Sequence, residues 1–493
     1  MLQLKSDEQF RVVRDLLDKA EYTEAHLCSR FGIENLEKFE DEFDRSQIDD
    51  FEKDATGVLI QLFVEGHFVD VTLAERHFGS EVLQAMADLG MVERNPSSNA
   101  QISSTVALYP TAGVHIVSDR WNLPDRSSYK PREDVVYPAI VSNAQRFLKF
   151  LPGTECRTFL ELCSGTAFAG LHAAERFAGH VWAFDISDRS TLFGEFNRRL
   201  NGIANATVAS GDLYAPADGL KFERIVAHPP YVPVLRPKWI YHDGGEDGEQ
   251  IVRRCVAELP GYLEPGGIFY LLAMASDRED APYEQRVRSW LGEQEQEFDI
   301  AVFATRSLDP EEFAVRAVMN SENSTADYRE FRRLFRSLGV KDMIYAVLMI
   351  QRRAETRPVF TIRRQTGPGT RSEQILNAMA WETSLASPDG LERMMQSRPK
   401  ANEQSELRVR HRMTGNGWEI DEYMLRGSFP FSMEARTDPW APYLMAQCDG
   451  TKTVVECFEN LKTQEAIPSG ADATEFARAL AVLVSGGFLQ LEQ

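Results

Sequence analysis

The chain has 493 residues, of which 43% are hydrophobic and 26% are charged. This composition is typical of globular domains and excludes disorder over most of the chain, and the length predicts about three domains. Lys and Arg number 54 against 75 Asp and Glu, which gives a net charge of −21. That charge disfavours nucleic acid and anionic membranes as partners, although it leaves room for a local basic patch.

Cysteine and histidine spacing and hydropathy indicate which kinds of site and which membrane segments the chain lacks. The 6 cysteines form no C-x-x-C pair and the 9 histidines show no ligand spacing, which disfavours a disulfide framework and a zinc site. The N-terminal segment is charged throughout, and no window approaches the roughly 18 consecutive apolar residues of a membrane span. We therefore expect a cytoplasmic protein without a resident metal.

Residues 1–118 predict a small module of helices and strands. Apolar residues recur at helical spacing in 8–20, 56–66, 71–79 and 80–94, which predicts helices there. Residues 101–110 and 113–119 show the alternation of paired strands. Helices followed by a hairpin indicate a winged-helix-like module. Its third helix is acidic, which favours protein contact or scaffolding over DNA binding.

Residues 119–365 alternate strands with helices, which predicts a parallel sheet with crossover helices. We expect an α/β, doubly wound domain of seven strands, at 157–165, 180–187, 205–214, 224–231, 267–276, 298–305 and 342–351. The segment 361–371 is polar and rich in Gly and Pro, which predicts a linker. Residues 372–493 predict an α+β module that ends in a winged-helix-like segment.

Carboxylates follow three successive strands of the α/β domain. Glu161 lies near the end of the first strand, before a turn at Ser164 and Gly165 that opens a helix. Asp185 ends the next strand about 20 residues beyond the turn, where doubly wound nucleoside binders place an acid on the ribose. Asp212 closes the third strand. Three acids at one sheet edge predict a nucleoside site more readily than three helix caps.

The fourth strand ends in His228-Pro229-Pro230-Tyr231, and here the sequence resembles a known family. The order ELCSG, FDIS, GDLY and HPPY is similar to that of class I S-adenosylmethionine-dependent methyltransferases of the NPPY group, which includes the HemK-type release-factor glutamine methyltransferases and the rRNA guanine-N2 enzymes. The stretches 129–134 and 241–259 agree with segments of that group. The resemblance implies a Rossmann-like domain with S-adenosyl-L-methionine as cofactor.

The resemblance also implies site residues, carried across one by one. The cofactor-binding set, which would hold the methionine part, the ribose and the adenine and close the pocket over them, is Tyr129, Glu133, Asp134, Glu161, Cys163, Ser164, Gly165, Phe168, Asp185, Ile186, Asp212, Leu213 and His228. The catalytic set is His228, Pro229 and Tyr231, and the substrate-binding set is Pro230, Tyr231, Tyr241 and His242.

Two departures from the family pattern bear on the function. Cys163 and Ala167 stand where the family usually has Gly. His228 replaces the Asn, Asp or Ser of the motif; a neutral imidazole accepts one hydrogen bond, and its reference pKa of about 6.5 also allows proton uptake. Hydroxyls, acidic N–H groups and ring nitrogens therefore join amides as acceptors, and packing or hydrogen bonding of the loop is the alternative role for His228. Tyr231 would stack on a flat acceptor or cap an apolar cleft.

We therefore expect a methyltransferase that acts on a nitrogen or oxygen of a protein, peptide or small-molecule acceptor. Methylation of RNA or of a translation factor is the alternative, and His228 keeps open a catalytically silent nucleoside-binding regulator. Ten basic side chains between residues 329 and 364 could face RNA. Such a run more often pairs with an acidic module of the same chain.

Overall fold

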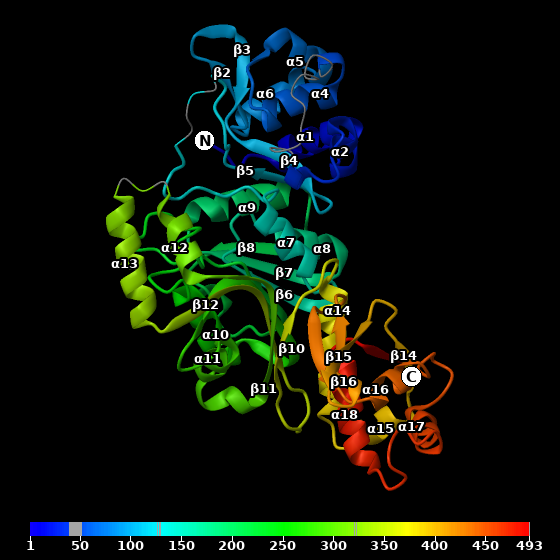
Figure 1. Ribbon diagram of the computed structural model, residues 1–493. Coiled ribbons are helices and arrows are strands. Elements are labelled where there is room, and N and C mark those ends of the chain that lie inside the picture. The colour runs from blue at the N-terminus through cyan, green and yellow to red at the C-terminus, as the bar shows by residue number, and fades with distance from the viewer. Residues whose placement is uncertain (39–51, 126, 128–129, 320, 322, 493) are drawn as a thin grey trace. The chain divides into compact units, whose positions relative to one another are not determined.

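The computed structural model describes residues 1–38, 52–125, 127, 130–319, 321 and 323–492 (Figure 1). They form two compact units, one of Met1–Met274 with Arg329–Leu334 and the other of Ala275–Tyr328 with Phe335–Gln493. In the described part of the chain, no helix combines the length and the apolar character that crossing a bilayer requires.

The first unit opens with two helices. α1 (Asp7–Lys19) lies where the apolar period predicts it and buries four side chains at helical spacing, Phe10, Val13, Leu16 and Leu17. α2 (Glu24–Phe31) begins at Thr23, whose side chain accepts the N–H of His26, and ends at Gly32 with φ 66°.

A second group of elements alternates helices with a small antiparallel sheet of order β1-β3-β2. Its members are α4 (Ala55–Leu59), β1 (Val69–Asp70), α5 (Val71–Phe78), α6 (Ser80–Asp88), β2 (Val92–Asn95) and β3 (Ser98–Ser104). The third predicted helix therefore ends at Asp88, since residues 92–95 form a strand. Because β3 takes the start of the segment 101–110, the predicted hairpin is confined to β4 (Ala107–Thr111) and β5 (Val114–Ser118).

One eight-stranded mixed sheet carries the α/β part, in the order β13-β11-β12-β10-β9-β6-β7-β8. Its strands are β6 (Cys156–Leu162), β7 (Ala178–Asp185), β8 (Ala206–Ser210), β9 (Phe222–Ala227), β10 (Leu263–Arg278), β11 (Phe298–Leu308), β12 (Val340–Arg352) and β13 (Thr361–Gln365). Strands β6 to β10 run parallel and β12 runs antiparallel to β11. The seven predicted strands are all present, and β13 is an eighth.

This eighth strand overturns the linker predicted at residues 361–371, because β13 pairs in parallel with β11. Its arginines are accommodated in an edge strand since carboxylates of the same unit neutralise them. The ion pairs of this basic run are Arg363 with Asp277 and Glu284, Arg364 with Glu382, Arg352 with Glu297, and Arg357 with Asp299. Acids of the same unit, rather than the acidic N-terminal segment, therefore pair with these members of the run.

Helices connect the strands and carry the N-terminal hairpin. They are α7 (Ser142–Phe150), α8 (Phe168–Arg176), α9 (Asp188–Leu200), α10 (Gln250–Glu258), α11 (Tyr283–Trp290), α12 (Pro310–Val318) and α13 (Ser324–Ser337). The buried side chain of Asn197 bonds both the N–H and the carbonyl of Val117 on β5, and Asn201 does the same to His115. Two asparagines one helical turn apart thus satisfy the edge of β5 and fix that hairpin to α9.

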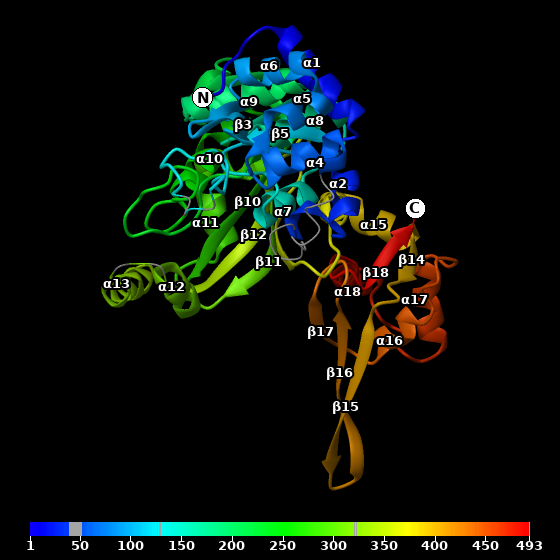
Figure 2. The same ribbon diagram turned by 90° about the horizontal axis from the view of Figure 1, so that it is seen from above.

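The second unit includes a C-terminal module with its own core (Figure 2). Its elements are α14 (Ser372–Leu385), α15 (Gly390–Gln396), β14 (Arg398–Ala401), β15 (Glu406–Thr414), β16 (Gly417–Gly427), β17 (Met433–Thr437), α16 (Trp440–Met445), α17 (Val454–Thr463), α18 (Ala473–Ser485) and β18 (Leu489–Glu492). β14 pairs with β18, and β15, β16 and β17 form a separate sheet. Within this module, the ribbon of β15 and β16 extends beyond the helices α16 to α18 (Figure 2).

Candidate functional site

The loop after β6 turns through three residues with positive φ. They are Cys163 at 54°, Gly165 at 54° and Ala167 at 61°. This left-handed region favours glycine, and a residue with a Cβ costs about 1–2 kcal/mol there. Both departures from the family's glycines therefore occupy strained backbone positions, and the turn keeps its shape without glycine at either one.

Glu161 faces the helix that follows this loop. Its buried carboxylate accepts the N–H of Gly170 at 2.7 Å, and a Cβ at position 170 would lie 2.8 Å from the same oxygen. Burial raises the pKa of Glu161 to about 8, although the N–H groups of Gly170 and Ala169 act in the opposite direction. The side chain thus holds the first turn of α8 against the end of β6.

Asp185 ends β7 and reaches the same loop. Its carboxylate accepts the N–H of Gly165 at 2.8 Å and the N–H of Ser187 at 2.9 Å. Burial raises the pKa of Asp185, and these two donors oppose the rise. Ile186, the next residue, is 60% exposed and presents an apolar surface beside this acid.

Three further members of the predicted cofactor set lie after β8 and at the start of α8. Asp212 is exposed and pairs with Arg254 at 2.9 Å. Leu213 is buried and has a φ of 49°. Phe168 is buried, with its ring centroid 6.3 Å from that of Phe147.

The segment before α7 holds three residues of the predicted cofactor set. Arg132 pairs with Asp134 and holds the pKa of that carboxyl below its usual range. Glu133 has an exposed side chain, and its carbonyl accepts the N–H of Ile240 at 3.2 Å. Tyr129, the third residue of this group, lies outside the described residues.

His228 lies between two aromatic rings at the end of β9. Its ring centroid is 5.1 Å from that of Phe147, at an interplanar angle of 9°, and 5.6 Å from that of Tyr231, at 28°. Burial lowers the pKa of His228 to about 4, with a smaller contribution from Arg146. The ring is therefore neutral at pH 7. In the Nδ1–H tautomer, its Nε2 is a hydrogen-bond acceptor.

Two buried polar atoms at this edge lack hydrogen-bond partners among the described residues, the Oγ of Ser164 and the Nε2 of His228. Leu162 of β6 and Ala227 of β9 are register partners, so both atoms follow the ends of neighbouring strands. A ligand or water can complete the bonding of such atoms, and these two follow strand ends at the edge that also carries Asp185. The two atoms therefore point to a ligand site at this edge.

Tyr231 is held in place rather than free. It is buried, and its hydroxyl accepts the side-chain N–H of Asn143 at 3.0 Å. Pro229 before it is buried and Pro230 is partly exposed. Stacking of Tyr231 on His228 makes one aromatic layer that is shared by α7 and the loop after β9.

The chain folds back after this loop and brings two more predicted residues near it. Val232 pairs with Asp243, whose carboxylate lies 2.7 Å from Nδ1 of the half-buried His242. Tyr241 stacks on Tyr137, with centroids 4.8 Å apart and planes at 13°.

Sequence reasoning missed residues that hold this edge together. Asn197 also donates to the carbonyl of Thr166 in the loop after β6, at 3.0 Å. Its position on the apolar side of α9, near Phe193 and Phe196, was a usable signal, because a polar residue there must have bonding partners.

A partly buried ion pair was missed as well. Asp119 pairs with Arg189 and accepts the N–H of Val136 at 2.8 Å, which ties the segment before α7 to the first turn of α9. The two side chains are 70 residues apart in the chain, so no local pattern could indicate the pair.

The residues present fit the expected nucleoside. A carboxylate has about four acceptor positions, so Asp185 retains capacity beyond its two N–H bonds, and the hydroxyl of Ser164 is available. Ile186 and Leu213 offer apolar surface for a flat base. Over the described ranges, no group of three or more His, Cys, Asp or Glu side chains is arranged to hold a metal ion.

A cavity of about 450 Å³ lies in the second unit. Two charged residues of its lining are paired, because Arg364 bonds Glu382 and the carbonyl of Ser485, whose hydroxyl also donates to Glu382. The cavity therefore offers apolar room without a group suited to group transfer.

Comparison with known proteins places residues 140–301 in the methyltransferase small domain family. A protein of Methanocaldococcus jannaschii, named by inference a protein N5-glutamine methyltransferase, is 30% identical over 150 residues, which are 29% of this chain and 71% of that protein. The ribosomal protein uL3 glutamine methyltransferase of Bradyrhizobium diazoefficiens is 29% identical over 170 residues, 32% of this chain and 53% of that protein.

The release factor glutamine methyltransferase of Moorella thermoacetica is 32% identical over 165 residues, 31% of this chain and 56% of that protein. This chain thus spans little more than half the length of the last two relatives. Among solved structures, a methyltransferase from Pyrococcus furiosus is 16% identical and matches with a TM-score of 0.29, over 47% of this chain and 89% of that chain.

Proposed function

The chain belongs to the class I S-adenosylmethionine-dependent methyltransferases, and from that premise we propose that it methylates the side-chain amide nitrogen of a glutamine in a protein. The observation that carries the proposal is the buried Nε2 of His228, which has no partner among the described residues. A carboxamide has N–H donors that can complete this bonding. The relatives that are named for glutamine methylation support the same acceptor.

The cofactor would lie across the loop after β6. Asp185 would accept hydrogen bonds from the ribose hydroxyls, the hydroxyl of Ser164 would bond the methionine part, and Ile186 with Leu213 would flank the adenine. When bound, the cofactor would supply a methyl group on a sulfonium sulfur, and that sulfur would leave with the electron pair of the C–S bond as the new N–C bond forms. The chain therefore needs to align the acceptor rather than activate the methyl group.

His228 and the carbonyl of Pro229 would align the acceptor. Each would accept one N–H of the carboxamide and so direct the nitrogen toward the methyl group. Proline fixes its own φ, which holds that carbonyl in place, and the rings of Phe147 and Tyr231 hold the imidazole. Positioning of this kind is the main contribution that the chain can make to the rate.

The low pKa of His228 favours nitrogen over oxygen as the acceptor atom. A group with a pKa of about 4 is a weak base at neutral pH, so it serves poorly to deprotonate a hydroxyl. A carboxamide nitrogen that has gained a methyl group and kept both protons is positively charged and strongly acidic, so one of these protons can pass to water. His228 therefore acts as a hydrogen-bond acceptor, not as a general base.

We also propose a three-part architecture of residues 1–118, 119–365 and 372–493. The order α4, β1, α5, α6, β2, β3, in which β3 pairs with both other strands, supports a winged helix in the first part. In the last part, α17, α18 and β18 support a winged-helix-like end. The exposed acid Glu81 on α6 favours a protein over DNA as the contact of the first module.

Labelled cofactor and a host lysate test the proposed reaction. After incubation with the full chain, the lysate is separated into protein, RNA and small molecules. Label in the protein fraction, mapped by mass spectrometry to a glutamine side chain, is the expected result. Label confined to RNA or to small molecules would contradict the proposed acceptor, and cofactor binding without any labelled product would indicate a silent nucleoside-binding protein.

A further inference from the structure

The cavity of about 450 Å³ in the second unit lies among β13, α14, α15, β17 and α18. Its size is near the lower end of the range of roughly 300–1,000 Å³ that small-molecule sites span. Its apolar lining consists of Ile362, Leu385, Leu391, Met433, Ala481 and Val482. We name this space the α18 cavity, because several of its lining residues come from that helix.

Helix and strand periodicity explain why these residues meet. On α18, Arg478, Ala481 and Ser485 are separated by three and four positions, a spacing that puts them on one face of the helix. On β13, Ile362 and Arg364 are two positions apart and therefore share one face of the strand. The α18 cavity thus has a helix face and a strand face of the same unit among its walls.

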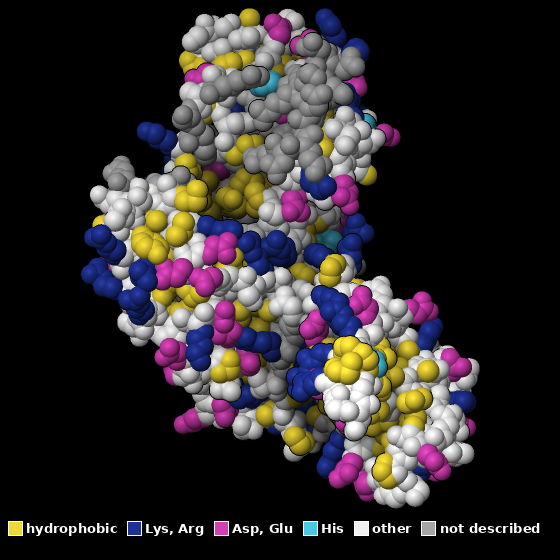
Figure 3. Space-filling view, in the orientation of Figure 1, with side chains coloured by type: hydrophobic (Ala, Val, Ile, Leu, Met, Phe, Trp, Pro, Cys, Tyr) yellow, Lys and Arg dark blue, Asp and Glu magenta, His cyan; other side chains and the backbone are white. Residues whose placement is uncertain are grey.

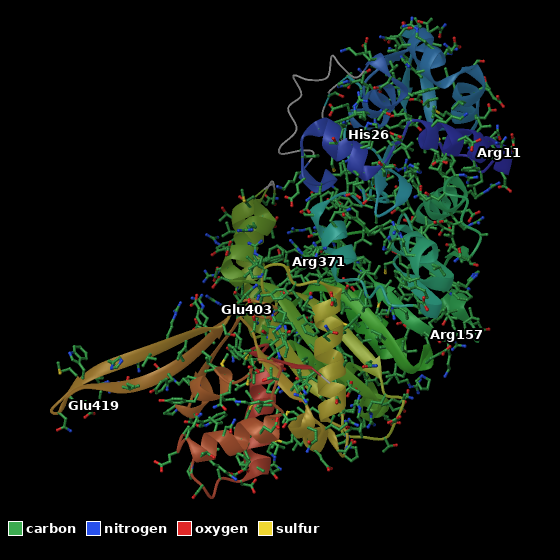
Figure 4. The ribbon with its side chains drawn as sticks, turned by 90° about the vertical axis from the view of Figure 1, so that its right-hand side faces the viewer. Arg11, His26, Arg157, Arg371, Glu403 and Glu419 are labelled. Carbon is green, nitrogen blue, oxygen red and sulfur yellow. The ribbon has the colours of Figure 1, made fainter. Side chains whose placement is uncertain are left out.

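The apolar lining is continuous with the core of the C-terminal module. Leu385, Leu391 and Met433 pack against that core and also line the α18 cavity. In Figure 4, α14 begins after Arg371 and runs alongside α18, which carries the opposite part of the lining. Figure 3 shows that hydrophobic side chains also reach the surface of this module. The core is therefore not closed on every side by its own chain.

Most polar groups of the lining bond one another. Arg364 donates to Glu382 at 3.0 Å and to the carbonyl of Ser485 at 2.9 Å. The hydroxyl of Ser485 donates to Glu382 at 2.8 Å and accepts the indole N–H of Trp381 at 3.0 Å. A water molecule in a cavity needs about two to four polar partners. This network leaves few of them, so an apolar molecule can displace such water favourably.

Arg478 is the exception among these polar groups. Its side chain is exposed, and it forms no ion pair and no hydrogen bond with any residue that the structure describes. The lining thus has two arginines against one glutamate, and the charge of Arg364 is matched by Glu382. A guanidinium has only donors and pairs best with a carboxylate, which it can bond through two parallel N–H groups. The α18 cavity therefore combines apolar walls with one unmatched positive charge.

We propose that the α18 cavity binds an aliphatic monocarboxylate, with its chain among the apolar side chains and its carboxylate on Arg478. No aromatic side chain lines the cavity in the part of the chain that is described, so a flat ring would find no stacking partner. Leucine, isoleucine and methionine side chains suit a flexible chain better, and the thioether of Met433 adapts to its shape.

Isothermal titration calorimetry of the full chain with octanoate, decanoate and decanol tests the proposal, without added cofactor. Each buried methylene should tighten binding about fourfold, so decanoate should bind on the order of tenfold more tightly than octanoate. Decanoate should also bind about three- to tenfold more tightly than decanol, which lacks the charge. The net charge of −21 repels anions in general, so such a preference reports on a local site.

Arg478→Gln tests the assigned cation. We expect this variant to bind decanoate about three- to tenfold more weakly and decanol as the wild type does, because only the charged bond is lost. The control Arg412→Gln removes the same charge from an exposed arginine of β15 that pairs with Asp421 and does not line the cavity. It should leave both affinities unchanged.

Ala481→Leu tests the assigned space. The larger side chain points from a buried position of the lining into the α18 cavity and suits a helix. We expect it to weaken octanoate, decanoate and decanol alike, since it takes the room of the chain. Far-UV circular dichroism and thermal unfolding must show that both lining variants are folded, and Arg478→Gln changes only an exposed side chain.

A wild-type chain that binds no decanoate overturns the proposal. Decanoate affinity that is unchanged in Arg478→Gln, or that falls equally in Arg412→Gln, overturns the assignment of the carboxylate to Arg478. Affinity that is unchanged in folded Ala481→Leu places the ligand elsewhere and overturns it as well. None of these measurements involves the methyl acceptor or the cofactor, so the proposed function can fail independently.

Discussion

The loops that follow the neighbouring strands β6 and β9 are built in opposite ways. The loop after β6 turns through left-handed residues, and it is the backbone N–H of Gly165 that Asp185 binds. The loop after β9 presents one side chain, the ring of His228, which lies between two aromatic rings and is followed by two prolines. The first loop depends on the path of the backbone, and the second depends on the identity of one residue.

The departures from the family pattern show what this difference means. Cys163 and Ala167 replace glycines in the first loop, yet the left-handed turn is kept. His228 replaces the amide or acid of the motif and changes the bonding that the second loop offers. Substitution in the first loop therefore changes mainly stability, and substitution in the second changes chemistry.

Removing the carboxylate that fixes the first loop should have the largest effect. Asp185→Ala loses the acceptor for the Gly165 N–H and for the ribose, and hydrogen bonds to charged groups contribute about 1.5–3 kcal/mol each. We expect cofactor affinity to fall about 100-fold or more in isothermal titration calorimetry. The control Asp212→Ala, at an exposed acid already paired with Arg254, should lose less than about tenfold. Equal losses in the two variants would remove the special role of Asp185.

Changing the side chain of the second loop should affect turnover alone. His228→Ala should leave cofactor affinity unchanged and lower turnover about 10- to 100-fold, because an acceptor for a buried N–H is lost. His228→Asn places the residue of the family motif there and should recover most of the rate. Turnover on the labelled protein fraction measures both variants. An alanine variant with wild-type turnover would exclude His228 from the mechanism.

The pH dependence of the free energy of unfolding tests the burial of His228 in the loop after β9, and we expect a smaller effect than for the two changes above. The folded-state pKa of His228, about 4, lies below its unfolded value of about 6.5, so at pH 5 the unfolded chain binds a proton that the folded chain does not. The contribution of His228 to stability is therefore lost as pH falls below 6.5, by about 2 kcal/mol at pH 5. The raised pKa of Glu161 acts in the opposite direction in both proteins, so denaturant unfolding of the cofactor-free chain at pH 7 and 5 compares the wild type with His228→Asn, which should lose about 2 kcal/mol less over that interval. The same loss in both proteins would contradict the low pKa.

The smallest expected effect is the change in stability when alanine is replaced by glycine, either in the loop after β6 or in α8. Ala167→Gly relieves a left-handed backbone and should change stability by between zero and about 1 kcal/mol in the favourable direction. Ala169→Gly, on the ordinary helical backbone of α8, should cost about 1 kcal/mol. Thermal unfolding compares the two. If Ala167→Gly is destabilising by as much as Ala169→Gly, the loop is not strained.

Much of the site followed from local pattern. The ends of β6, β7 and β9 were recognisable from buried strands that stop at Glu161, Asp185 and His228, because parallel strands bring their carboxyl ends to one edge. The stack of Phe147 on His228 was not recognisable from the sequence, because the two residues are 81 positions apart and meet only when α7 packs near β9. The bonds from Asn197 to Val117 and Thr166 are of the same kind.

Composition gave a wrong prediction for the edge strand β13. The segment 361–371 has the polar residues of a linker, but Thr361–Gln365 pairs with β11 because Asp277, Glu284 and Glu382 neutralise its arginines. A charge that is costly in a strand on its own becomes acceptable once its partner lies in another element. A window of sequence contains no information on that partner.

Strand periodicity, the carboxylates at strand ends and the HPPY motif were thus legible in the order of the residues, because they depend on neighbours along the chain. The tertiary structure decided what the order could not. It makes His228 a neutral acceptor by burying it between rings, leaves the hydroxyl of Ser164 without a partner among the described residues, and brings alternating residues of β15 and β16 to one apolar face. Burial, stacking and register arise from residues far apart in sequence, and they set the bonding that each side chain has left to offer.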